Sequence, residues 1–134
     1  MTSEKDMENE NHVRLRVLSK QYTPDQLESL IGVKSDRSWL AGELRKNTTI
    51  KEKMNGWLIE SRLDKCEEIE KHINKLFDRV AGYELEIKKL SSDNKIELLC
   101  AVYSKEVPSL YFDKDIVSKI SALGANFDID LYLL

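Results

Sequence analysis

The sequence has few of the residues that build the commonest catalytic and metal sites. Its 134 residues include two Cys, two His, two Pro and five Gly. Neither His12 nor His72 has a Cys or a second His nearby in sequence, so the ligand spacing of a zinc site is missing. Gly-x-Ser-x-Gly, His-Glu-x-x-His and glycine-rich phosphate loops are missing as well. These absences predict a protein that is not an enzyme and that has no metal or cofactor.

Long apolar runs are also missing, and none approaches the roughly 20 residues that a membrane-spanning helix needs. Residues 1–11 are acidic, whereas a signal peptide would be basic and then apolar. We therefore expect a cytoplasmic protein with no membrane partner. Because residues 1–11 show no apolar periodicity, they are expected to be a disordered acidic tail, and residues 12–134 a single domain.

The charges nearly balance, with 21 Lys and Arg against 24 Asp and Glu. The acidic tail accounts for the net charge of −3, which leaves residues 12–134 neutral. A neutral domain argues against a nucleic acid partner, because binding to a phosphate backbone requires an excess of basic residues. Cys66 and Cys100 fall at apolar positions, and both are expected to be reduced and buried.

Two periodicities alternate along the chain and predict an α+β domain. Extended segments are expected where apolar residues alternate with polar ones or form a short continuous run. These segments are 12–17, 56–62, 95–104, 109–112 and 127–133. A short helix is expected at 24–31, where Thr23 and Gln26 form a capping box, and another after Asp113 or Asp115.

The strongest helical signal is a stripe of residues spaced alternately three and four apart. They are Cys66, Ile69, Ile73, Leu76, Val80, Tyr83, Ile87 and Leu90. This stripe predicts one long helix over about 64–91, kinked at Gly82. A strand at 83–87 is the alternative. The stripe could cover the sheet of its own chain or form a coiled-coil seam with a second copy. His72 is expected to be exposed on the solvated flank of this helix.

The order of elements predicts a mostly antiparallel sheet of four to five strands. One long and two short helices would pack on one face, close to the split β-α-β (ferredoxin-like) arrangement. If the first and last strands are neighbours, Arg14 and Arg16 lie opposite Asp128 and Asp130 and form cross-strand ion pairs. The alternative for the two aspartates is a carboxylate pair that holds a metal.

Residues 34–54 form a long polar segment without periodicity, which is uncommon inside a small domain. Basic residues outnumber acidic ones there, and they surround Trp39. Since Trp and Arg are the commonest anchors of protein interfaces, Arg37, Trp39, Arg45 and Lys46 are the candidate partner-binding residues. The alternative is that Trp39 covers the sheet edge or packs on the core.

This arrangement resembles the bacterial domain-of-unknown-function family 4279. The resemblance rests on Leu30-Ile31-Gly32, on Gly56-Trp57-Leu58-Ile59-Glu60-Ser61, on the long helix and on the closing segment 123–132. It covers about 12–134 and implies a single small α+β domain with no established activity. No catalytic residue is carried over, and the 34–54 segment is the part least like the family.

The leading hypothesis is a non-enzymatic interaction domain that binds a protein partner. An immunity-type protein that neutralises a toxin by surface complementarity is its concrete form. The first alternative is a small-molecule-binding or regulatory module with a pocket between the sheet and the long helix. The second is a hydrolase in which Asp128 and Asp130 hold a metal. The chain is expected to be a monomer or a homodimer.

Overall fold

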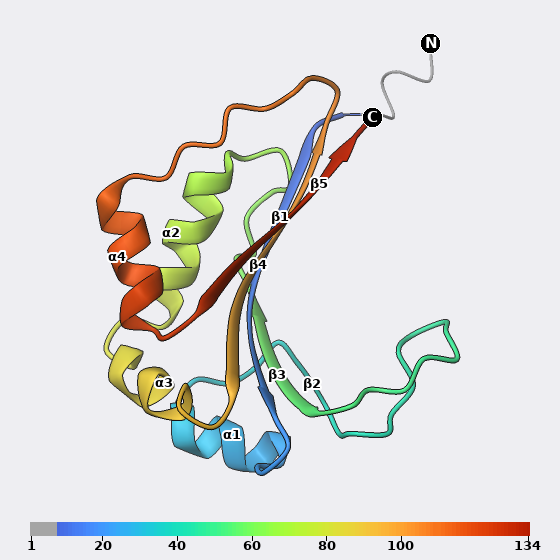
Figure 1. Cartoon of the computed structure of the whole chain (residues 1–134), viewed down its shortest axis with the longest axis vertical. Coiled ribbons are helices and arrows are strands. Elements are labelled where there is room, and N and C mark those ends of the chain that lie inside the picture. The colour runs from blue at the N-terminus through green and yellow to red at the C-terminus, as the bar shows by residue number, and fades with distance from the viewer. Residues whose placement is uncertain (1–7) are drawn as a thin grey trace.

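A five-stranded mixed sheet organises the chain (Figure 1). The computed structural model describes residues 8–134. The strands lie in the spatial order β2 (Arg37–Trp39), β3 (Asn55–Glu60), β1 (Glu10–Ser19), β4 (Lys95–Ser104) and β5 (Asn126–Leu133). Neighbouring strands are antiparallel, except that β4 and β5 are parallel. The predicted α+β class is therefore confirmed, but the sheet is mixed, and the ferredoxin-like resemblance is not confirmed.

Strand β1 lies at the centre of the sheet, and its alternating sequence places Val13, Leu15 and Val17 in the core. It begins at Glu10, two residues earlier than expected, so that residues 10 and 11 belong to the sheet and not to a tail. Residues 1–7 of the predicted tail lie outside the described residues. The intervening side chains of β1 point to the other face of the sheet, which no helix of residues 8–134 covers (Figure 1).

Four helices pack on one face or at one end of the sheet. They are α1 (Pro24–Ile31), α2 (Ile69–Arg79), α3 (Glu84–Leu90) and α4 (Lys114–Ala122). The α1 helix has the predicted bounds and capping box, and Asp113 caps α4. Within residues 8–134, no helix is both long and apolar enough to cross a membrane.

The single long helix predicted over 64–91 is wrong, because the chain breaks into α2 and α3. Gly82 has a φ of 89°, in the left-handed region that ends helices, and the second helix starts after Tyr83. The two helices share one apolar stripe, and Ile73, Val80 and Ile87 are fully buried in the core of this chain. The stripe covers its own sheet and is not a coiled-coil seam, and the alternative strand at 83–87 is also wrong.

Two other predictions about the sheet are wrong. The segment Ser109–Phe112 is not a strand, because the chain crosses there from β4 to α4 before β5 joins parallel to β4. Strands β1 and β5 are not neighbours, because β4 lies between them. The outer face therefore pairs Arg16 with Glu97 of β4, at 2.8 Å, and not with Asp128 or Asp130.

Candidate functional site

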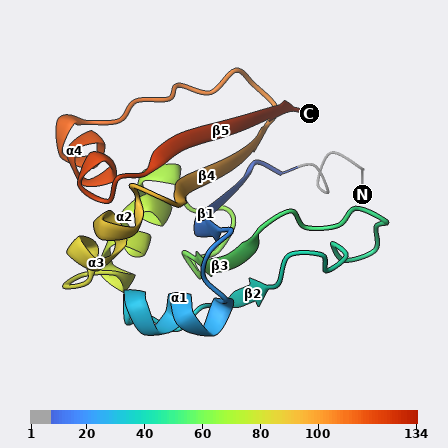
Figure 2. The same cartoon turned by 60° about the horizontal axis from the view of Figure 1, so that its bottom comes forward.

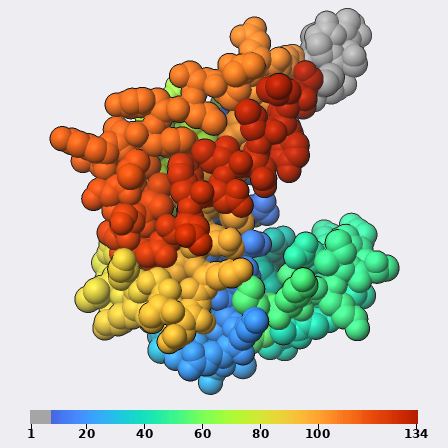
Figure 3. Space-filling model, viewed as in Figure 1, coloured from blue at the N-terminus to red at the C-terminus, as the bar shows by residue number. Residues whose placement is uncertain are grey.

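Residues 40–54 form an arm that leaves the sheet after β2 and returns to it at β3 (Figure 2). The two limbs are joined by an isolated bridge between Leu44 and Lys51, and the amide of Arg45 donates to the Ile50 carbonyl at 2.8 Å. The predicted long loop is thus an irregular hairpin. Residues 40–50 are all exposed, and the arm stands apart from the body of the molecule (Figure 3).

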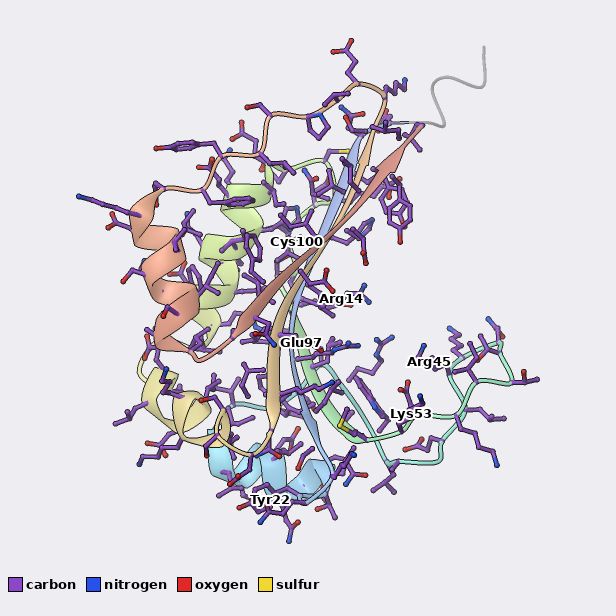
Figure 4. The ribbon with its side chains drawn as sticks, in the orientation of Figure 1. Arg14, Tyr22, Arg45, Lys53, Glu97 and Cys100 are labelled. Carbon is purple, nitrogen blue, oxygen red and sulfur yellow. The ribbon has the colours of Figure 1, made fainter. Side chains whose placement is uncertain are left out.

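The surface of the arm combines apolar and basic side chains. Leu40, Leu44 and Ile50 are each about half exposed or more. The basic residues of the arm outnumber its acidic residues, and of these basic residues only Arg45 forms an ion pair within residues 8–134, with Glu52 at 3.2 Å. Figure 4 shows Arg45 and Lys53 on this projection. Apolar side chains that are half exposed, beside an excess of positive charge, are typical of a contact surface.

The other two candidate residues lie at the base of the arm, in strand β2. Trp39 is paired in register with Gly56 of β3, and its indole lies directly on the Gly56 backbone, where a Cβ would overlap the ring. The Arg37 guanidinium lies 5.7 Å from the ring centroid of Trp39. Trp39 is half-buried and covers the sheet edge. The structure therefore brings Arg37 and Trp39 together, and places Arg45 and Lys46 separately on the arm.

Replacing Gly56 with alanine tests the position of the Trp39 indole. The new methyl group would displace the ring from the sheet, and we expect the free energy of unfolding to fall by about 2 kcal/mol. In a Trp39→Ala background the same substitution should cost less than about 0.5 kcal/mol, because the overlapping ring is gone. Urea denaturation of the four proteins measures this coupling, and equal costs in both backgrounds would contradict the packing described.

Asp36 anchors the start of β2 to two other parts of the fold. Its carboxylate accepts hydrogen bonds from Arg79 at the end of α2, at 2.5 Å, and from the Glu60 amide at 2.7 Å. It also pairs with Arg62. Burial opposes ionisation of Asp36, but these donors outweigh it and lower the pKa of the carboxyl to about 2. The ion-pair network holds β2, and with it the base of the arm.

A polar pocket of about 310 Å³ opens where β1 loses its partner β3. The Ser61 amide donates to the Val13 carbonyl at 3.3 Å, and the next backbone contact is from Asn11 to Lys65 at 2.8 Å. Between these contacts the chain leaves the ladder, and Arg62 has a φ of 62°, a conformation that is strained for a residue other than glycine. The pocket reaches from the outer face of the sheet to α2.

Ser61 and His72 form a buried pair at the pocket, where Ser61 Oγ and His72 Nδ1 share a hydrogen bond of 2.6 Å. The prediction of an exposed His72 is wrong, since its side chain is 1% exposed. Burial disfavours the charged imidazolium and lowers the pKa of His72, although the Asp64 carbonyl partly opposes this. The sequence contains a signal for this burial, because His72 lies three residues after Ile69 and four before Leu76 of the apolar stripe.

The remaining candidates from the sequence do not form a site. Cys100 is buried as predicted, and burial together with Asp128 raises the pKa of its thiol to about 12. Cys66 lies outside the core, because it precedes α2, and the prediction that it is buried is wrong. Asp128 and Asp130 lie on the outer face of β5, and within residues 8–134 no group of three His, Cys, Asp or Glu side chains could hold a metal.

Comparison with known families gives one further finding. The model of a protein family described as a domain of unknown function (DUF4279) matches residues 9–134. The match spans essentially the whole chain and confirms the resemblance based on the strand, helix and closing segments. No curated protein and no solved structure matches the chain.

Proposed function

Since the chain belongs to the DUF4279 family, whose description names no activity, we propose its function from its own surface: a non-enzymatic interaction domain that binds a protein partner through the arm and strand β2. The observation that carries the proposal is the arm itself. About half of the surface of its apolar residues Leu40, Leu44 and Ile50 stays exposed, although burying them would stabilise the fold. A surface of this kind is retained when something else covers it.

The charged and apolar side chains of the arm indicate what kind of partner surface it would bind. Its basic excess fits an acidic surface, and Leu44 and Ile50 fit apolar recesses within that surface. Arg37 and Trp39, stacked at the base, supply the type of residue that dominates binding energy at interfaces. A toxin neutralised by this contact is the specific partner that we propose, which makes the protein an immunity-type domain acting in the cytoplasm.

A photo-crosslinking amino acid at Ile50 tests the proposal in cells that express the full chain. We expect one discrete adduct with a heterologous protein. Val117 on α4 is the matched control, because it is 54% exposed and Ile50 is 52% exposed. No discrete adduct is expected from position 117.

The purified partner from the Ile50 adduct should then bind the wild-type chain. Its binding should weaken at least about tenfold with the double charge reversal Arg45→Glu and Lys46→Glu. The result that would overturn the proposal is the same set of adducts from both positions, or no discrete adduct from position 50. An adduct at twice the mass of the chain would show that the partner is a second copy of this chain and not a heterologous protein.

A further inference from the structure

The pocket between β1 and the chain after β3 contains two buried nitrogen atoms with no hydrogen-bond partner. They are Nε of Arg14 and Nε2 of His72, and both residues line the pocket. Native proteins rarely leave a buried polar group unpaired. The carbonyls of Asp64 and Glu67 act on the His72 ring, so the unpaired Nε of Arg14 is the atom in this pocket that points to a ligand.

The charges of the pocket favour an anion that carries a single charge. Arg62 is held by Asp36, and Lys65 is paired with Glu10 at 3.3 Å. Arg14 is in none of the ion pairs formed within residues 8–134, so its guanidinium is the available cation. Figure 4 shows Arg14 on the side of the sheet that faces away from α2 and α4. Glu60, which lies opposite Arg14 in the ladder, would repel a second negative charge.

We propose that this pocket binds a small organic monocarboxylate. Its carboxylate would pair with the planar guanidinium of Arg14, which matches the geometry of a carboxylate with two parallel hydrogen bonds. The apolar body of the ligand would lie against Leu63 and Ala101.

This inference goes beyond the proposed function, because no pocket residue belongs to the arm or to β2. The volume of about 310 Å³ is at the lower end of the range for small-molecule sites, which restricts the ligand to a carboxylate on a body about the size of one ring. A change at Arg14 should therefore leave crosslinking from Ile50 unaltered, and the two proposals can fail separately.

The test uses the full chain, with sodium benzoate as the probe and sodium chloride as the reference at constant ionic strength. In ¹⁵N NMR spectra we expect the Nε–H signal of Arg14 to shift saturably with benzoate and not with chloride. Acetate lacks an apolar body and is expected to bind at least about fivefold more weakly. Inorganic phosphate is also expected to bind more weakly than benzoate, because its second charge faces Glu60.

Variants of β1 provide the matched comparison. Arg14→Met should weaken benzoate binding at least about tenfold, and Arg14→Lys, which keeps the charge but loses the planar fork, should be intermediate. Arg16→Met is the control, because Arg16 lies on the same face of β1 and pairs with Glu97. Its affinity for benzoate should equal that of the wild type.

Three results would overturn the assignment. They are a shift of the Arg14 signal that does not saturate, tighter binding of phosphate than of benzoate, and an equal loss of affinity in Arg16→Met. The Arg14 signal of the wild-type chain is itself a readout, so the proposal stays falsifiable even when a variant fails to fold.

Discussion

Replacing Asp36 with alanine is expected to lower the free energy of unfolding by about 3 kcal/mol, because Arg79 loses its ion-pair partner in a largely buried position and keeps the Glu60 carbonyl as an acceptor. The Arg79 side chain is 15% exposed and that of Asp36 is 14% exposed, so solvent screens their interaction only in part. The Glu60 amide loses its acceptor as well. Chemical denaturation measures this loss directly when the free energy of unfolding falls with denaturant concentration at the same slope in both proteins.

The pH dependence of stability identifies the carboxylate as the cause. The pKa of Asp36 is lowered in the folded protein from an ordinary 3.8 to about 2, so its contribution is complete above about pH 4. This contribution is lost as the pH falls from 4 towards 2. We expect the difference in the free energy of unfolding between wild type and Asp36→Ala to narrow over that interval by about 1 kcal/mol, because solvent screens part of the interaction.

Asp93→Ala is the matched control for Asp36. Asp93 is an exposed carboxylate in the turn between α3 and β4, and its removal should change the free energy of unfolding by less than about 0.5 kcal/mol. The anchoring role of the network would be contradicted if Asp36→Ala changed the free energy of unfolding as little as Asp93→Ala does. It would also be contradicted if the difference in this free energy between wild type and Asp36→Ala did not depend on pH.

Replacing Trp57 with alanine is expected to cost about 4 kcal/mol, the largest effect that we expect from a single substitution. Trp57 is fully buried in β3, where it packs among the residues of the core cluster. Its Nε1 donates to the Val33 carbonyl at 3.0 Å and so ties the segment before β2 to the core. Removal of the indole leaves a large cavity and an unpaired carbonyl.

Trp57→Phe separates these two contributions. The smaller ring keeps part of the packing but removes the donor, and we expect a cost of about 2 kcal/mol. Amide exchange adds a local readout, because the Asp36 amide, which donates to the Leu58 carbonyl at 2.8 Å, should lose protection first. A cost below about 1 kcal/mol for Trp57→Ala would show that the core does not depend on this side chain.

The candidate site was only partly predictable. The composition of residues 34–54 marked the segment as unusual, and its cations and exposed apolar residues do project from the body. The stacking of Trp39 on Gly56 was not predictable, because it depends on the register between β2 and β3. The pocket was missed altogether. Ser61 and His72 are 11 residues apart, and no known spacing motif joins them.

The sequence alone determined those elements whose signals lie within a few residues of one another. The capping box at Thr23, the alternation of β1 and the closing strand are local, so near neighbours in the chain suffice to specify them. Only the tertiary structure decided that β4 lies between β1 and β5, that the helical stripe breaks into two helices at Gly82, and that Arg14 and His72 line one pocket. These features depend on contacts between distant segments, which compete with local preference and are formed only when the core packs.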